Sequence, residues 1–99
     1  MAEIIWSQAA LNDIDEIANY IARDSEHYAN AVVEKIVALS RRLADHPRAG
    51  RVVPELNDEA TRERFVYNYR MIYHVEENRI LILAVIHGKR LIESIQDRF

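Results

Sequence analysis

Apolar residues recur every three or four positions over residues 11–21 and again over 29–43, with polar residues between them. This spacing is typical of amphipathic helices. Ser7 and Ser25 stand just before the two patterns, where a serine side chain caps a helix N-terminus. We therefore predict two antiparallel helices that join their apolar stripes. The acid-rich opposite face of the first helix, Asn12 to Asn19, is expected to be solvated.

The second half of the chain has the composition of β-strands. Tyr69–Val75 and Ile80–Ile86 are rich in aromatic and β-branched residues, and the short polar break between them fits only a hairpin. Arg62–Val66 alternates charge and bulk and predicts a third strand. With Glu3–Trp6 as a short first strand, the predicted order is β-α-α-β-β-β, followed by an amphipathic tail at Leu91–Phe99.

The register of the hairpin decides which side chains share a face. A two-residue turn at Glu77-Asn78 would pair Arg70 with Val85 and place Arg70, His74 and His87 on one face. The other face would be apolar except for tyrosine hydroxyls, and its residues are Tyr69, Met71, Tyr73, Val75, Ile80, Ile82, Ala84 and Ile86. We expect the helical hairpin to bury that face, giving a two-layer α+β domain with an antiparallel meander sheet.

The loop between Arg62–Val66 and Tyr69–Val75 decides which face of the sheet three arginines occupy. A three-residue loop with Asn68 in the left-handed region would place Arg62, Arg64 and Arg70 on one face, and we prefer it. Such a cluster would need an anion or an acidic group to relieve its repulsion. A two-residue turn would separate the arginines. A structural ion pair with an acidic neighbour is the alternative role for Arg70.

Length and composition limit the kinds of protein that this chain could be. Ninety-nine residues with 49% hydrophobic content fit one domain spanning 1–99. The absence of cysteine excludes disulfides and thiolate metal sites, and the histidines are not spaced as ligands, so we expect no metal and no cofactor. The net charge of −3 argues against direct nucleic-acid binding. The first residues fit neither a signal peptide nor a membrane span, so a cytoplasmic location is expected.

Several phrases together resemble the RelE/ParE toxin superfamily, and within it the ParE-like branch. They are Trp6 with Ala9-Ala10, Ile17–Ile21, His46-Pro47 with Gly50–Glu55, Arg62-Glu63, Asn68–Tyr73 and Ile86–Arg90. The resemblance spans nearly the whole chain. It implies the toxin of a bacterial type II toxin–antitoxin system, neutralised in a hetero-oligomer by a cognate antitoxin whose C-terminal segment wraps the toxin.

The resemblance leaves the activity open, because the superfamily contains both gyrase poisons and nucleases. The ParE-like branch implies inhibition of DNA gyrase by protein binding. The alternatives are a RelE-like ribosome-dependent mRNA endonuclease, and an inactive homologue that only binds its antitoxin. Fold alone does not decide between them.

Residue matches to the RelE-like nucleases are incomplete. Arg70 and Arg90 match two arginines that hold the scissile phosphate in those enzymes, whereas Arg62 and Arg64 lie one residue out of register with their catalytic lysines. Gln96 stands where they carry an acid–base tyrosine, and an arginine remains protonated and cannot replace a lysine in proton transfer. If the chain is a nuclease, its remaining catalytic residues are predicted to be His74 and His87, beside Arg70 and Arg90.

If the chain acts by binding a target, we expect the segment after Gly88 to contribute to the contact. The residues predicted to contact a target are Arg62, Arg64, Arg70, Lys89, Arg90, Leu91, Ile92 and Ile95. A few buried anchors and one arginine can dominate such an interface. The alternative is that Leu91, Ile92 and Ile95 close the core over Leu81, Leu83 and Val85.

Overall fold

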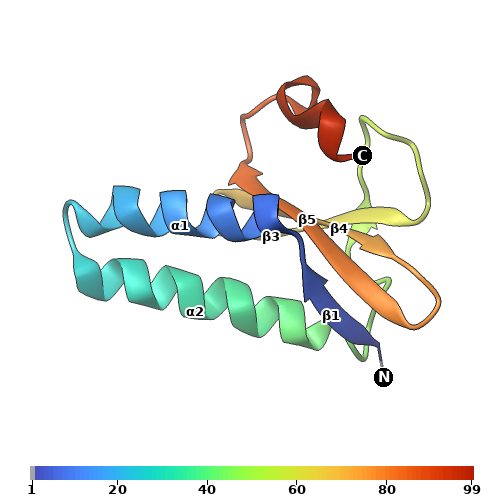
Figure 1. The fold of residues 1–99 in the computed structure, drawn as a ribbon, viewed down its shortest axis with the longest axis horizontal. Coiled ribbons are helices and arrows are strands. Elements are labelled where there is room, and N and C mark those ends of the chain that lie inside the picture. The colour runs from blue at the N-terminus through green and yellow to red at the C-terminus, as the bar shows by residue number, and fades with distance from the viewer. Residues whose placement is uncertain (1) are drawn as a thin grey trace.

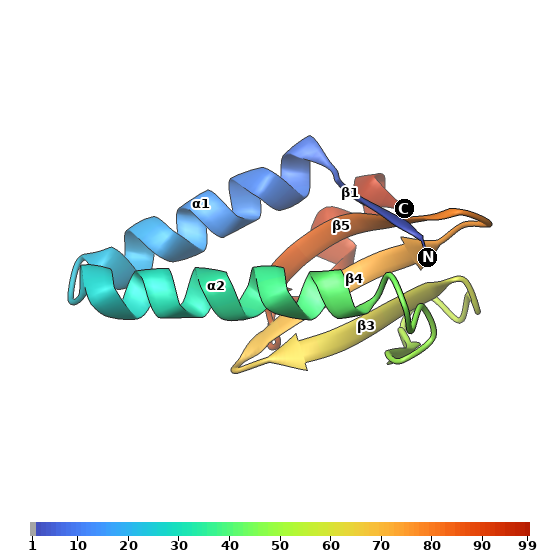
Figure 2. The same cartoon turned by 90° about the horizontal axis from the view of Figure 1, so that it is seen from below.

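A helical hairpin lies along one face of a five-stranded sheet in the computed structural model, which describes residues 2–99 (Figures 1 and 2). The helices are α1 (Gln8–Ala22) and α2 (Glu26–Arg42). The strands are β1 (Glu3–Trp6), β2 (Arg51–Val52), β3 (Thr61–Val66), β4 (Tyr69–Val75) and β5 (Arg79–His87). A kinked 3₁₀ helix, η1 (Ile92–Arg98), follows β5.

The sheet has the order β1-β5-β4-β3-β2, with β1 parallel to β5 and every other neighbouring pair antiparallel. The predicted α+β fold, with a helical hairpin packed on a meander of β3, β4 and β5, is confirmed. Strand β2 was not predicted, because it is only two residues long and lies in a connection rich in turn residues.

Both predicted serine caps are present. The Ser7 hydroxyl accepts a hydrogen bond from the Ala10 amide at 3.1 Å, and the Ser25 hydroxyl accepts one from the Tyr28 amide at 3.0 Å. Each bond satisfies one of the amides that have no partner within the first turn of a helix. These local signals fix where the hairpin begins and where it reverses.

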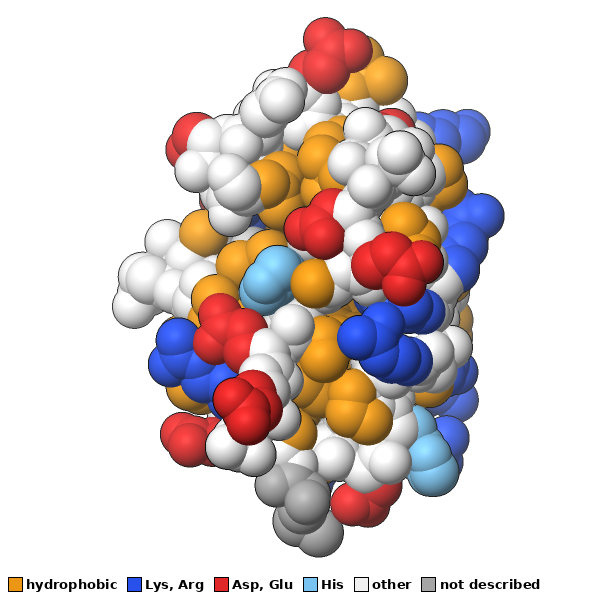
Figure 3. Space-filling view, turned by 90° about the vertical axis from the view of Figure 1, so that its right-hand side faces the viewer, with side chains coloured by type: hydrophobic (Ala, Val, Ile, Leu, Met, Phe, Trp, Pro, Cys, Tyr) orange, Lys and Arg blue, Asp and Glu red, His pale blue; other side chains and the backbone are white. Residues whose placement is uncertain are grey.

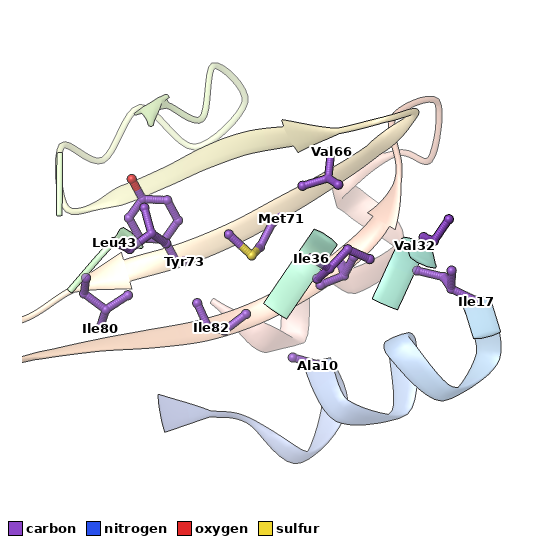
Figure 4. Packing of buried hydrophobic residues seen from close by; sticks show 11 residues of the cluster. Ala10, Ile17, Val32, Ile36, Leu43, Val66, Met71, Tyr73, Ile80 and Ile82 are labelled. Carbon is purple, nitrogen blue, oxygen red and sulfur yellow. The ribbon is translucent and has the colours of Figure 1, made fainter. Parts of the chain in front are cut away.

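Apolar residues are buried on both faces of the sheet. Side chains of β4 and β5 meet those of α1 and α2 in the larger cluster, which contains Ala10, Ile17, Val32, Ile36, Leu43, Val66, Met71, Tyr73, Ile80, Ile82 and Val85 (Figure 4). On the opposite face, Val53, Ile72, Ala84, Ile86, Ile92 and Ile95 form a second cluster. The segment after β5 therefore covers the face that the helices leave open.

A β-bulge shifts the register of β5 halfway along the hairpin. Near its turn the predicted pairing holds, with Val75 opposite Ile80. Beyond the bulge Ile72 pairs with Ala84, so Leu83 is an extra residue and Arg70 faces Ile86 rather than Val85. An extra residue turns every following side chain to the other face. The prediction that Ala84 and Ile86 face the helices is therefore wrong, since Val85 does.

The β3–β4 connection is a two-residue turn, not the three-residue loop that we preferred. Val66 pairs with Tyr69, and Tyr67 rather than Asn68 has the positive φ, at 53°. In this register Arg62 and Arg64 alternate with Glu63, so they lie on the helix face while Arg70 lies on the other. The predicted cluster of three arginines does not form.

Asp13 of α1 is buried, contrary to the expectation that this acidic face is solvated. Its exposed fraction is 6%, and its Oδ2 accepts hydrogen bonds from the Val85 amide at 2.9 Å and from Arg98 Nη1 at 2.6 Å. Arg98 Nη1 also donates to the Leu83 carbonyl at 3.2 Å, and Nη2 donates to Asp13 Oδ1 at 3.1 Å. We call Asp13 and Arg98 the bulge clamp, because they satisfy the main chain of the bulge and tie the end of η1 to α1.

Candidate functional site

Arg70 and Glu63 form the buried centre of a network of ion pairs on the face of the sheet opposite the helices. Arg70 Nη1 and Nη2 donate to the two carboxylate oxygens of Glu55 at 2.8 and 2.9 Å. Its Nε donates to Glu63 Oε1 at 2.7 Å, and Arg51 Nε donates to Glu63 Oε2 at 2.6 Å. The exposed fractions of Arg70 and Glu63 are 4% and 1%. Two cations and two anions thus balance each other.

Strand pairing brings this network together. Glu63 stands opposite Ile72, so it is the diagonal neighbour of Arg70 on the same face of β3 and β4. Glu55 comes from the loop after β2 and reaches over Arg70 from the solvent side, with 43% of its side chain exposed. The fork of Arg70 that could bind a phosphate with two hydrogen bonds is therefore already occupied by a carboxylate.

The electrostatics of the pair agree with its geometry. The hydrogen bond from Arg70 holds the pKa of the Glu55 carboxyl below its ordinary value, against the opposing effect of its partial burial. The hydrogen bond to Glu55 likewise raises the pKa of Arg70. Both groups are charged at neutral pH, and the structure gives Arg70 the ion-paired role that the sequence left as an alternative.

The structure does not bring the predicted histidines together around Arg70. His74 shares the face of Arg70 but lies four residues along β4, about 13 Å away at the rise of a strand. His87 lies on the helix face, because the bulge reverses the sides of β5, and its ring packs edge-on against Tyr69 at 6.0 Å between centroids. The predicted common face of Arg70, His74 and His87 is therefore wrong.

Arg62 and Arg64 are also separated from Arg70. Arg62 donates to the Gly50 carbonyl and to the Glu59 carbonyl, both at 3.0 Å, and 14% of its side chain is exposed. These bonds tie β3 to the residue before β2 and to the connection between β2 and β3. Arg64 lies opposite Met71 and is half-buried.

The end of β5 and the β3–β4 turn form an exposed surface rich in aromatic and basic residues. The Gly88 amide donates to the Asn68 carbonyl at 2.7 Å and joins the two segments. A groove of about 340 Å³ runs between them. We call this surface the β5-end surface and define it by Phe65, Tyr67, His87, Lys89, Arg90 and Leu91, all of which are exposed.

The predicted target-contacting residues of the tail divide into two groups. Lys89, Arg90 and Leu91 are exposed, and Arg90 Nε donates to the Ser94 hydroxyl at 2.9 Å. Ile92 and Ile95 are 5% and 2% exposed and belong to the second core cluster. These two residues therefore close the core, although they do so over Ile72, Ala84 and Ile86 rather than over Leu81, Leu83 and Val85.

Sequence reasoning missed the acidic partners and the bulge clamp. Glu63 was predictable in part, since a two-residue β3–β4 turn places it beside Arg70. Glu55 was not, because it comes from an irregular loop. Asp13 looks like any other acid on the polar side of α1, and only the bulge gives it a buried partner.

Two further properties concern the part of the chain that the structure describes. Across residues 2–99, no three His, Asp or Glu side chains gather closely enough to hold a metal ion. Neither helix of the hairpin, nor η1, has the length and apolarity that a membrane span needs within that range.

The fold is similar to that of solved toxins of the RelE/ParE superfamily. The family model described as the ParE toxin of the type II toxin–antitoxin system parDE matches residues 4–92. The chain therefore belongs to the ParE toxin family.

Individual relatives carry names from both the ParE-like and the RelE-like branches. The protein named Toxin RelE2 from Caulobacter vibrioides is 28% identical over 91 residues, which cover 92% of this chain and 100% of that protein. The chromosomal ParDE toxin–antitoxin system of P. aeruginosa contains a chain of similar fold, with a TM-score of 0.71, 22% identity and coverage of 88% of this chain and 96% of that one. The RelBE2 toxin–antitoxin complex of Mycobacterium tuberculosis contains another, with a TM-score of 0.63, 18% identity and coverage of 87% and 96%.

Proposed function

We propose that this toxin acts by binding a protein target, DNA gyrase, and performs no cleavage chemistry of its own. The observation that carries the proposal is the closed ion-pair network around Arg70. To hold a phosphate, Arg70 would have to release Glu55, and the anion would then lie beside Glu63, whose side chain is fully buried. Like charges brought together at low dielectric repel strongly, so this face is poorly suited to bind RNA.

Acid–base catalysis lacks suitable groups at this place as well. A general base or acid must lie within hydrogen-bond reach of the proton that it transfers. His74 is about 13 Å along the strand from Arg70, and His87 lies on the other face of the sheet. Gln96, which stands where the nucleases carry a tyrosine, is exposed and cannot transfer a proton at neutral pH.

The β5-end surface is the candidate docking surface for gyrase. It combines exposed aromatic rings with Lys89 and Arg90, and aromatic and arginine side chains dominate many protein interfaces. Tyr67 adds support, because a bulky residue at φ 53° is costly and such strain is concentrated at functional sites. Leu91, 68% exposed, adds an apolar contact.

A cognate antitoxin is the second proposed partner. Relatives of this fold occur in complexes named RelBE2 and YoeB-YefM, which are toxin–antitoxin pairs. We propose a hetero-oligomer of the same kind here, formed in the cytoplasm. A RelE-like mRNA endonuclease remains the second candidate for the activity, since the relative from Caulobacter vibrioides carries the name RelE2.

A supercoiling assay with purified gyrase tests the proposed target. The chain should inhibit supercoiling, and Arg90→Ala should weaken this inhibition about tenfold or more, as expected when an interface arginine that contributes about 1.4 kcal/mol or more is lost. Arg42→Ala removes an exposed arginine at the far end of α2 and should leave inhibition unchanged. Both variants should retain wild-type stability, since both side chains are exposed.

Two outcomes would overturn the proposal. Fresh mRNA cuts within ribosome-bound codons after induction in cells, abolished by Arg70→Ala, would favour the endonuclease. Antitoxin binding with neither gyrase inhibition nor mRNA cleavage would indicate an inactive homologue.

A further inference from the structure

A cavity of about 410 Å³ opens on the face opposite the helices, at the other end of the sheet from the β5-end surface. Its apolar walls are Leu56, Leu81, Leu83 and Phe99, and its polar walls include His74 and Arg98. The volume lies within the range of ligand pockets in proteins. Figure 3 views the side of the molecule where the C-terminus and the β4–β5 turn lie, and it shows hydrophobic side chains bordered by histidine, acidic and basic groups.

A chain of hydrogen bonds fixes the proton on His74. Asp58 accepts hydrogen bonds from the Ala60 amide at 3.1 Å and from the Thr61 hydroxyl at 2.9 Å, and these bonds lower the pKa of the Asp58 carboxyl. Asp58 is therefore an acceptor at neutral pH, and the single hydroxyl proton of Thr61 is committed to it. The 3.1 Å contact between Thr61 Oγ1 and His74 Nδ1 then requires Nδ1–H to be the donor. In the neutral ring, Nε2 is left as an acceptor.

The Nε2 atom of His74 has no hydrogen-bond partner in the described chain. Over residues 2–99 no buried side-chain nitrogen or oxygen lacks a partner, so Nε2, which has none, must be accessible to solvent. His74 lines the cavity, and we infer that Nε2 meets solvent there. Arg98 lines the same cavity and uses three of its five N–H groups on Asp13 and on the Leu83 carbonyl. Its Nε–H and one Nη2–H have no protein acceptor in the described residues. The cavity thus offers acceptors, in His74 Nε2 and the Asp58 carboxylate, and free donors on Arg98, beside an apolar wall.

We propose that this cavity binds the tyrosine side chain of a partner polypeptide. The ring would lie against the leucines of β5, and the phenol hydroxyl would donate to His74 Nε2 and accept from Arg98. A hydroxyl matches both groups, whereas an indole N–H only donates and a phenylalanine ring leaves both unpaired. No residue of the β5-end surface lines this cavity, so the proposed binding is independent of the toxin's target.

Nuclear magnetic resonance titration of the isotope-labelled full chain tests the proposal, with N-acetyl-L-tyrosinamide and N-acetyl-L-phenylalaninamide as probes. The tyrosine probe should shift the methyl signals of Leu81 and Leu83. It should bind about tenfold more tightly than the phenylalanine probe, which corresponds to two hydrogen bonds of about 0.7 kcal/mol each. Equal binding of the two probes, or shifts confined to other surfaces, would overturn the proposal, and so would no shift with either probe.

Two matched variants locate the acceptor. His74→Phe removes Nε2 and should reduce the preference for the tyrosine probe, because only the bond from Arg98 is left to the phenol hydroxyl, while Thr61 keeps its bond to Asp58. His87→Phe changes the other strand-end histidine, on the opposite face, and should leave the preference intact. A preference that is undiminished in His74→Phe would refute the assignment of Nε2. If His74→Phe does not fold, the comparison of the two probes on the wild-type chain still decides.

Discussion

Replacing Asp13 with alanine tests whether the bulge clamp stabilises the fold by tying α1 to β5 and to the end of η1. The substitution removes both acceptor oxygens, so the Val85 amide and the Arg98 guanidinium lose their partner at once. The Val85 amide is buried on the side of β5 that faces α1, beyond the end of β1, and Asp13 Oδ2 is its partner there. Arg98 keeps only its bond to the Leu83 carbonyl.

The size of the effect follows from these two losses. An unsatisfied buried amide costs about 1–3 kcal/mol, and breaking a buried ion pair from one side costs about 3–5 kcal/mol. The two losses do not add in full. They share one carboxylate, and because 18% of the Arg98 side chain is exposed, water can solvate part of its charge. We expect the free energy of unfolding to fall by about 3 kcal/mol, which corresponds to a lower Tm by about 12–24 °C in a domain of this size.

Chemical denaturation and thermal melts followed by circular dichroism measure this loss. Asp15→Ala is the control, because Asp15 is an exposed acid on the same helix and its loss should change the stability by less than about 0.5 kcal/mol. Adding Arg98→Met to Asp13→Ala should cost less than the sum of the two single changes, since the unpaired cation is then gone. Equal stabilities of Asp13→Ala and Asp15→Ala would refute the reasoning.

Three further predictions concern other parts of the fold. Gly50→Ala should lower the free energy of unfolding by about 2 kcal/mol or more, because the added Cβ would clash with the Glu63 carbonyl oxygen of β3. Gly88→Ala should cost less, because its added Cβ would lie 3.2 Å from the nearest atom, the Asn68 carbonyl oxygen. Glu55→Gln should make the free energy of unfolding depend less on pH below 4.5, the ordinary pKa of a glutamate carboxyl. Folding lowers the pKa of Glu55, so its stabilising contribution is present above pH 4.5 and is lost as the pH falls through the lowered pKa. Denaturation at a series of pH values measures this, and an unchanged slope would contradict it. Ile95→Ala should cost about 2–5 kcal/mol in denaturant unfolding, as for a core residue, whereas a loss no larger than that of Leu91→Ala would return Ile95 to the docking surface.

Local patterns were sufficient for most elements of the fold. The apolar spacing and the two serines located the helices, because the caps and the helical period involve residues only a few positions apart. The strands β3, β4 and β5 were predicted within one or two residues from their composition. The resemblance to the toxin superfamily also followed from the sequence, since it depends on the order and spacing of short phrases.

Two single-residue features, which no local pattern revealed, decide which face of the sheet the strand side chains occupy. The extra residue Leu83 moves His87 to the helix face, and the two-residue turn at Tyr67 moves Arg62 and Arg64 away from Arg70. Because strand side chains alternate with a period of two, a shift of one residue exchanges the faces completely.

The sequence by itself determined the fold class, the family and the residues that carry charge. Only the tertiary structure decided which of those charges meet. Arg70 is neutralised by Glu55 from a distant loop and by Glu63 from the neighbouring strand. Asp13 is buried because the Val85 amide, just after the bulge and 72 residues away in the chain, donates to it. Such partners are set by the packing of segments far apart in sequence, where a loop conformation or one extra strand residue changes every contact.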